Sequence, residues 1–401
     1  MQWIEGGITA AKGYKAAGEH LGIRKNPGKR DVALVVSDCP ASAACCYTQN
    51  LVKGAPLLVT KQHVANGVAQ AILCNSGNAN TCNDNGVEIA NGMCALVEQY
   101  TGVKAENVVV ASTGVIGQPM TLQPFIDGFP LLAGALSTDG GHHAAKAIMT
   151  TDTVCKEVAL QFALGGKICT LGGMAKGSGM IHPNMATMLC FLTTDAAVSA
   201  AVLQTALSAV VQDTFNMLSV DGDTSTNDMI TVLANGMAGN EPSDADLPQF
   251  QEALQAVCEK LCRMMAKDGE GATKLITCTV TGAKDVQNAK AAAKAVICSS
   301  LVKSAFFGAD ANWGRVLCAI GYSGAQVDVE RVDIQFRSAA GLLSVCKAGR
   351  SIPFDEAAAS DILREDEIDI LVQCMDGNAV ATAWGCDLTY DYVRINGDYR
   401  T

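Results

Sequence analysis

The stretch KGSGMIHPNMATMLCF, residues 176–191, leads from a glycine-bearing segment into an apolar run. Residues 187–191 have the composition of the start of a buried strand. The segment before them ends on Ala186, so Thr187 occupies the first position of a predicted core strand. A hydroxyl at this junction calls for an explanation from packing or from chemistry.

Thr187 could act as a nucleophile without a histidine. A hydroxyl needs a base within hydrogen-bond reach, and the α-amino group of Thr187 would supply one, with a pKa of roughly 7.7–8.0. That amino group exists only after the Thr187 hydroxyl has attacked the Ala186 carbonyl and water has hydrolysed the resulting ester. Gly177 and Gly179 are expected to give the approach its positive φ angles. The plain alternative is a glycine-rich loop that enters a core strand.

The composition indicates a compact globular protein. Of the 401 residues, 49% are hydrophobic and 17% are charged, which is enough for a large core in two lobes or subdomains. The formal net charge is −11 and no run of Lys or Arg forms a basic stripe, so a nucleic-acid partner is disfavoured. No membrane-spanning apolar stretch and no signal peptide are recognised, and we expect a soluble cytoplasmic protein.

The 17 cysteines are expected to be reduced. Their number is odd, many lie in apolar runs, and Cys45 and Cys46 are adjacent, which is a poor geometry for disulfides. The chain has no C-x-x-C pair and only five histidines, so we expect no metal site. His142 and His143 are expected in a solvent-exposed loop, and His182 in a turn.

Short β-rich runs alternate with amphipathic segments. Strands are predicted in 31–38, 70–77 and 107–113, helices in 86–102, 200–215, 250–269 and 285–308, a surface loop in 240–248, and strands again in 332–338, 368–375 and 378–396. This order indicates an α/β fold of layered sheets and helices. No glycine-rich nucleotide-binding motif and no G-x-S-x-G elbow occurs.

Five separated motifs resemble those of the glutamate N-acetyltransferase family, also called ornithine acetyltransferases. They are STGVIG (112–117), AIMTTDT (147–153), KGSGMIHPNMATML (176–189), DGEGATK (268–274) and YVRINGDYRT (392–401). The likeness extends over essentially the whole chain. It implies a layered α/β enzyme that cuts itself into an α chain, 1–186, and a β chain, 187–401, with Thr187 as the N-terminal nucleophile. The two chains would stay associated, as a heterotetramer.

The resemblance also implies roles for single residues. Thr187 would be the nucleophile of self-cleavage and of acetyl transfer. Thr113 and Gly114 would point a hydroxyl and a backbone N–H at the developing oxyanion. Lys176 would bind a carboxylate, and Glu270 an ammonium group.

Further residues would complete the substrate pocket by the same resemblance. They are Thr150, Asn396 and the C-terminal Thr401. Whether Thr150, Thr151 or Thr153 contacts substrate is left open, because all three lie in one short run.

Two more segments match the family without receiving a role, and one residue departs from its pattern. The segments are SVDGDTSTND (219–228) and GADANWGRVL (308–317). Cys155 stands where proline is common in the family.

The implied reaction moves the acetyl group of N-acetylornithine to glutamate through acetyl-Thr187, giving ornithine and N-acetylglutamate in arginine biosynthesis. No cofactor is expected, and acetyl-CoA is left open as a second donor. One alternative is a self-processing amidase or aminopeptidase with the same threonine, which would not need the substrate-binding set. Another is a non-enzymatic binding protein with an uncut chain.

Overall fold

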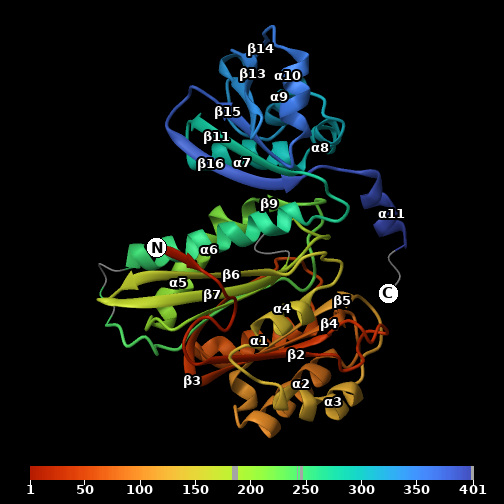
Figure 1. The fold of residues 1–401 in the computed structure, drawn as a ribbon, viewed down its shortest axis with the longest axis vertical. Helices are drawn as coiled ribbons and strands as arrows, with labels where there is room; N and C mark the ends of the chain where they lie inside the picture. The colour runs from red at the N-terminus through yellow and green to blue at the C-terminus, as the bar shows by residue number, and fades with distance from the viewer. Residues whose placement is uncertain (183–187, 242, 244–246, 399–401) are drawn as a thin grey trace.

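The computed structural model describes residues 1–182, 188–241, 243 and 247–398. Figure 1 shows two lobes, each built on its own sheet, with the long helix α6 (Leu247–Lys267) lying between them. The predicted α/β fold of layered sheets and helices is therefore confirmed. Thr187 and Ala186 lie outside the described residues, as does Thr401.

The larger sheet has nine strands among the described residues. From edge to edge the order is β1 (Gln2–Ile4), β6 (Lys156–Leu164), β7 (Lys167–Lys176), β8 (Leu189–Thr194), β10 (Met229–Ala234), β3 (Val32–Tyr47), β4 (Val68–Asn78) and β5 (Val108–Val115), and β2 (Tyr14–Glu19) pairs with β3. The central strands β8 and β10 are parallel, with Leu189 opposite Met229. The predicted core strand is therefore present from Leu189, while the predicted start at Thr187 lies outside the described residues.

Helices cover both faces of this sheet. The side chains of Ala33 and Val35 pack with α4 (Gly141–Ile148), whereas Val32 and Leu34 pack with α2 (Gly86–Thr101) and α3 (Gln123–Gly134). Alternate residues of β3 therefore serve two separate cores, because successive side chains of a strand point to opposite faces. Helix α1 (Ala55–His63) packs on β5, and α5 (Ala200–Asp213) packs on β3 and on α6.

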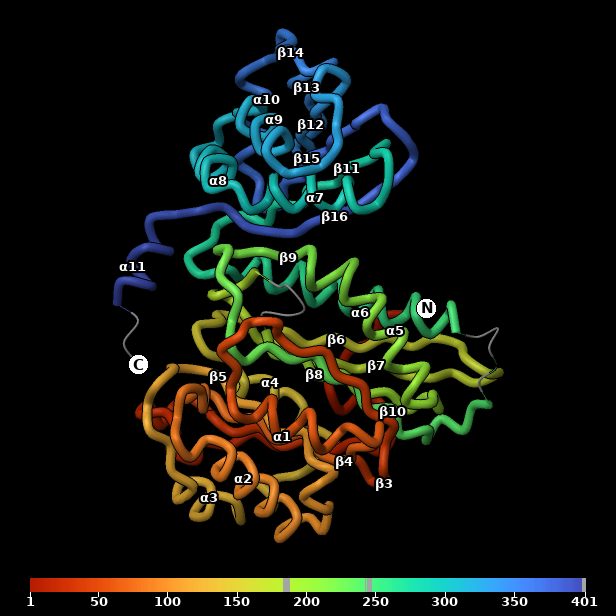
Figure 2. Tube along the Cα trace, turned by 180° about the vertical axis from the view of Figure 1, so that it is seen from behind, coloured from red at the N-terminus to blue at the C-terminus, as the bar shows by residue number. Residues whose placement is uncertain are grey.

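The second sheet has seven strands in the part of the chain that the structure describes. The order is β14 (Arg350–Ser351), β13 (Gly341–Lys347), β12 (Asp333–Ser338), β15 (Glu367–Gln373), β11 (Leu275–Ala283), β16 (Ala379–Cys386) and β9 (Leu218–Ser219). Its helices are α7 (Val286–Cys298), α8 (Ser300–Phe307), α9 (Trp313–Gly321) and α10 (Glu356–Arg364). Figures 1 and 2 show α11 (Tyr390–Asp398) leaving this lobe toward the larger one.

Three local predictions were wrong. The helix expected over 285–308 is two helices, because the Ser299 side chain accepts a hydrogen bond from Val302 N and caps a new helix. Residues 378–396, expected as strand, form β16 and then the helix α11. None of the side chains of α11 is buried, so its sequence lacks the regular spacing of apolar residues that indicates a helix. His142 and His143 lie in α4 rather than in a loop, on its exposed side.

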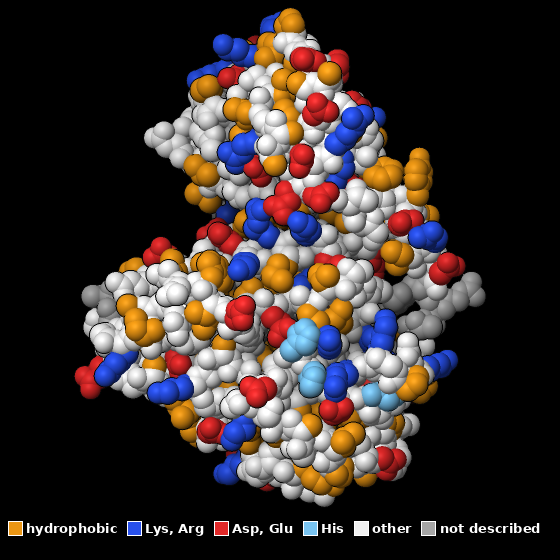
Figure 3. Space-filling view, in the orientation of Figure 1, with side chains coloured by type: hydrophobic (Ala, Val, Ile, Leu, Met, Phe, Trp, Pro, Cys, Tyr) orange, Lys and Arg blue, Asp and Glu red, His pale blue; other side chains and the backbone are white. Residues whose placement is uncertain are grey.

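The cysteines agree with the expectation from composition. All 17 cysteines are free, and most are buried. On the face drawn in Figure 3, Lys and Arg side chains are interspersed with Asp and Glu. Among the described residues, no helix is long and apolar enough to cross a membrane. Residues 242 and 244–246 of the predicted loop 240–248 lie outside the described ranges, and α6 begins at Leu247.

Candidate active site

A cavity of about 270 Å³ brings the predicted site residues together. Its lining comes from segments far apart in the sequence: Ala79, Thr113, Gly114, Val115, Ile116, Thr150, Thr151, Lys176, Gly179, Met180, Met188, Leu189, Ser225, Thr226, Asn227, Asp228, Glu270 and Asn396. This set contains every predicted site residue that the structure describes. Met188 and Leu189, which directly follow Thr187, also face the cavity. The roles of these residues stay predictions, but their convergence is an observation.

Thr113 and Gly114 lie at the irregular end of β5, where its register with β4 shifts. Gly114 has a φ of 132°, and a Cβ there would lie 2.3 Å from the carbonyl carbon of Gly77, so only glycine fits. Lys176 Nζ donates to Thr113 Oγ1 at 3.4 Å. An ammonium group can only donate, so the Thr113 oxygen is the acceptor and its own proton is left for another acceptor.

Asn227 holds the strand that carries Thr113. Its side-chain nitrogen donates to the carbonyl oxygens of Ala79 and Ser112, at 2.6 and 3.0 Å. Its side-chain oxygen accepts from the hydroxyls of Thr81 and Thr226, at 2.6 and 2.5 Å. The Asn227 side chain is buried and fully bonded, so it fixes the backbone next to the predicted oxyanion donors.

Glu270 and Asn396 form the side of the cavity nearest α11. Asn396 Nδ2 donates to Glu270 Oε2 at 2.8 Å, across more than a hundred residues of sequence. A Cβ on Gly179 would lie 2.3 Å from the Glu270 carboxyl carbon. The expectation of a positive φ at Gly179 was therefore wrong: Gly177 (157°) and Met180 (55°) have positive φ, and Gly179 is needed for room beside the carboxylate.

The run of threonines divides into two groups. Thr150 and Thr151 line the cavity, and the Thr151 and Ser178 hydroxyls lie 2.7 Å apart. Thr153 is not among the lining residues, and its hydroxyl and backbone N–H both donate to Asp268. Of the three threonines, only Thr150 and Thr151 are therefore placed to reach a molecule in this cavity, and which of them contacts substrate stays a prediction.

A buried ion cluster positions this segment, and the sequence analysis missed it. Lys156 Nζ lies 2.6 Å from both Asp152 Oδ1 and Asp268 Oδ2. Asp152 also accepts hydrogen bonds from the backbone N–H groups of Thr150 and Gly177, at 2.9 and 2.7 Å. Burial alone would raise the pKa of Asp152, but nearby ammonium groups and these hydrogen bonds lower it to about 2. The carboxylate therefore stays ionised and ties two walls of the cavity together.

The profile of the ArgJ family matches residues 15–401. The chain belongs to the ArgJ family. It is 52% identical over 406 residues to an arginine biosynthesis bifunctional protein ArgJ from Symbiobacterium thermophilum, and the alignment covers all of both chains. It is 49% identical to a protein of the same name from Caldanaerobacter subterraneus subsp. tengcongensis, again over the full length of both.

A solved ArgJ structure resembles part of this chain. The crystal structure of arginine biosynthesis bifunctional protein ArgJ from Bacillus halodurans is 50% identical and superposes with a TM-score of 0.51. The match covers 53% of this chain and 100% of that one. The family suggested by the five motifs is therefore confirmed.

The segment 219–228, which matched the family without a role, anchors the chain before the predicted cleavage site. Before the site, the Asp221 carboxylate accepts from the backbone N–H groups of Met180 and Ile181, at 2.6 and 2.9 Å. The His182 carbonyl accepts from the Thr224 hydroxyl at 2.8 Å. Burial lowers the pKa of His182 to about 4, so its ring is neutral at pH 7 and does not act as a charged group there.

Asp228 adds a buried carboxyl group that the sequence analysis did not assign. It lines the cavity, and the next residue, Met229, donates its N–H to the Met188 carbonyl at 2.9 Å. Asp228 Oδ2 has no hydrogen-bond partner in the part of the chain that the structure describes. Burial raises the pKa of Asp228 well above its ordinary value, against weaker lowering by Ser225 and Lys176. Burial thus favours the protonated form of this carboxyl group.

We expect the advantage in melting temperature of Asp228→Asn over its parent to grow as the pH rises above roughly 4. The folded-state pKa of Asp228 is raised, so the stability from the neutral carboxyl is complete below roughly pH 3.9 and is lost as the pH rises toward the folded value. Each pH unit in that window costs ~1.4 kcal/mol. An amide does not ionise and escapes this loss. Both proteins would carry Thr187→Ala to keep the chain uncut, and a pH-independent difference would contradict the raised pKa of Asp228.

Proposed function

We propose that this chain transfers the acetyl group of N-acetylornithine to glutamate through an acetyl ester on Thr187. The chain is an acetyltransferase of arginine biosynthesis by its family membership, since its full-length relatives are arginine biosynthesis bifunctional proteins. One observation carries the proposal for the site: Lys176 and Glu270 face a single cavity that also contains Thr113 and Gly114. A cation and an anion in one small cavity suit the carboxylate and ammonium of an amino acid.

The chemistry takes place in two half-reactions. The Thr187 hydroxyl attacks the acetyl carbonyl of N-acetylornithine, and its α-amino group takes the proton. The Thr113 hydroxyl and Gly114 N–H stabilise the oxyanion of the tetrahedral intermediate, each worth about 3–4 kcal/mol. The carbon–nitrogen bond then breaks, and ornithine leaves with the proton. Glutamate enters, its amine attacks the ester, and N-acetylglutamate leaves as the Thr187 hydroxyl is restored.

Two half-reactions explain how one cavity serves two substrates. N-acetylornithine and glutamate each carry an α-carboxylate, which Lys176 would bind. Lys176 is 8% exposed and Glu270 is 9% exposed. Their electrostatic interactions with substrate charges are therefore stronger than the same interactions in bulk water. Because ornithine leaves before glutamate arrives, the cavity of about 270 Å³ holds one amino acid at a time.

Cleavage between Ala186 and Thr187 is part of the proposal. The structure anchors Met180, Ile181 and His182 before this bond and Met188 after it, which suits a segment held for one backbone reaction. The solved Bacillus halodurans chain matches 53% of 401 residues, about 213. Residues 187–401 number 215, and the agreement in length supports a β chain of that size. We further propose that α and β chains associate as a heterotetramer in the cytoplasm.

An assay with defined donors and acceptors tests the proposal. Purified protein given N-acetylornithine and glutamate should form ornithine and N-acetylglutamate in equal amounts, without an added cofactor. Acetyl-CoA in place of N-acetylornithine tests the second donor. Release of acetate with no N-acetylglutamate would contradict the transferase and favour the amidase or aminopeptidase alternative. A denaturing gel with one uncut band and no turnover would favour the binding protein.

A further inference from the structure

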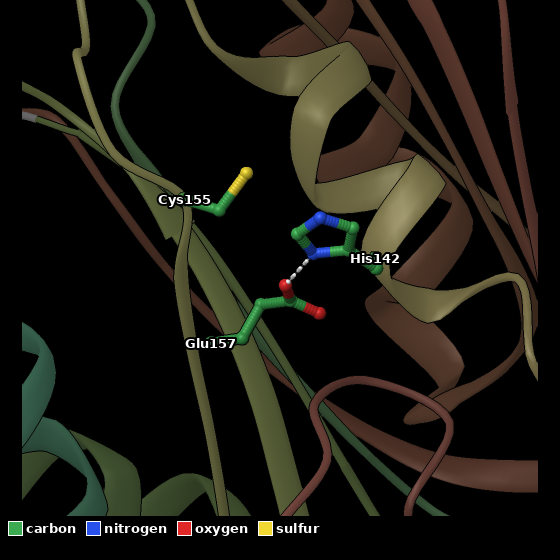
Figure 4. Close-up of side chains that lie close together, drawn as sticks. All are labelled: His142, Cys155 and Glu157. Carbon is green, nitrogen blue, oxygen red and sulfur yellow. Dashed lines mark hydrogen bonds and ion pairs between the residues drawn. The ribbon is translucent and has the colours of Figure 1, made fainter.

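Three metal-ligating side chains meet between helix α4 and the start of strand β6, outside the cavity (Figure 4). His142 extends from α4, and Cys155 and Glu157 extend toward it from the chain that enters β6. One ligand atom of each lies within 4.8 Å of the other two. Cys155 and Glu157 share a face because they are two residues apart in extended chain. Lys156, between them, points to the opposite side and into the buried ion cluster.

The three side chains can be reached from solvent, and apart from one His142–Glu157 contact they do not bond to one another. Glu157 Oε2 lies 2.5 Å from His142 Nδ1, and the His142 side chain is 54% exposed. Cys155 is half-buried, and its sulfur lies 3.4 Å from the thioether of Met149. A Cβ on Gly7 would lie 2.6 Å from Glu157 Oε1. Glycine at that position therefore leaves room for the carboxylate.

This donor set selects a class of ion. An imidazole, a thiol and a carboxylate are the three ligand types of Zn²⁺, whereas Mg²⁺ and Ca²⁺ require oxygen ligands. A tetrahedral Zn²⁺ ion holds its ligand atoms roughly 3.3–3.8 Å apart. The present spacing of up to 4.8 Å closes to that value with about 1 Å of side-chain movement. Three protein ligands leave a fourth position for water.

We propose that His142, Cys155 and Glu157 bind one thiophilic divalent cation such as Zn²⁺. This proposal differs from the expectation from sequence. No metal site was expected there, because the chain has no C-x-x-C pair and only five histidines. Binding releases the proton of the Cys155 thiol, and His142 and Glu157 bind as neutral imidazole and carboxylate.

An ion at this site would join two elements across the segment that carries predicted substrate contacts. Helix α4 ends at Ile148 and β6 begins at Lys156. The segment between them holds Thr150 and Thr151, which line the cavity. We therefore expect the bound ion to restrain residues 149–155, independently of which acyl donor or acceptor the enzyme uses.

The test uses full-length untagged protein in which the two exposed cysteines are removed by Cys82→Ser and Cys318→Ser. Calorimetric titration with ZnCl₂ should give one ion per chain, and Co²⁺ should give a thiolate-to-metal absorption band. Cys155→Ser should abolish the band. His142→Ala should weaken Zn²⁺ binding by more than roughly 10- to 100-fold, which is the loss typical of a residue that only hydrogen-bonds to a metal ligand. His143→Ala, on the next exposed position of the same helix, is the matched control and should bind normally.

Hydrogen exchange gives a second measurement. Zn²⁺ should slow exchange of the amides in residues 149–155 in the parent protein and leave Cys155→Ser unchanged. Absence of saturable binding in the parent would overturn the proposal. Equal binding by the parent and Cys155→Ser would overturn it as well, because the ion would then lie elsewhere.

Discussion

Thr187→Ala should remain a single chain of 41.6 kDa and lose acetyl transfer. The parent should instead give two fragments of about 19 and 22 kDa, from scaling the mass by 186 and 215 of 401 residues. Alanine has no hydroxyl to attack the Ala186 carbonyl or to carry the acetyl group. By analogy with the loss of other catalytic nucleophiles, turnover should fall roughly 10⁴-fold or more. A denaturing gel and the donor–acceptor assay measure both effects.

Thr187→Ser is the matched control for this variant. It keeps the hydroxyl and should still cut, giving a larger fragment that begins SMLCF where the parent fragment begins TMLCF. N-terminal sequencing distinguishes the two. Cleavage of Thr187→Ala at the same bond would show that the hydroxyl of residue 187 does not make the cut.

Thr113→Ala should lower kcat by roughly a hundredfold or more, with a smaller effect on stability. The Thr113 hydroxyl accepts from Lys176 and has its proton left to donate. A donor that acts only once charge develops affects kcat rather than substrate binding. Self-cleavage also passes through a tetrahedral centre, at Ala186, in a different geometry. The extent of cleavage must therefore be determined first, and kcat measured on the cut fraction.

Ser112→Ala separates catalysis from packing at this strand. The buried Ser112 hydroxyl donates to Asn75 Oδ1 at 2.6 Å and does not line the cavity. Its loss should cost about 1–3 kcal/mol of stability and leave kcat nearly unchanged. If Thr113→Ala behaves like Ser112→Ala, then Thr113 is only a strand-end residue and the oxyanion donor lies elsewhere.

Residues that share the cavity could be named from the sequence because each lies in a short motif that resembles one of the family. STGVIG, AIMTTDT and DGEGATK each contain a cavity residue that could be identified without knowing the fold. The alternation of short strands and amphipathic helices likewise predicted the α/β class. The break at Ser299 was missed because apolar spacing continues on both sides of it, and the stop comes from a single side-chain cap.

The supporting residues of the site could not be predicted in the same way. Asn227 contacts the Ser112 carbonyl, and Lys156 contacts Asp268, over more than a hundred residues of sequence. Such pairs arise only when the sheet register is set, and neither partner has a local pattern that names the other. His142 and Cys155 are close in sequence, but they also lack a local pattern that links them, and only the fold brings their side chains together.

The covalent intermediate tests the central claim most directly. Cut protein is mixed with N-acetylornithine in the absence of glutamate, quenched in acid, and its fragments are weighed by mass spectrometry. We predict a gain of one acetyl group on fragment 187–401, located at Thr187 by peptide mapping and lost when glutamate is added. Turnover with no acetylated fragment, together with intersecting double-reciprocal lines, would contradict the acetyl-threonine and require direct transfer between two bound substrates.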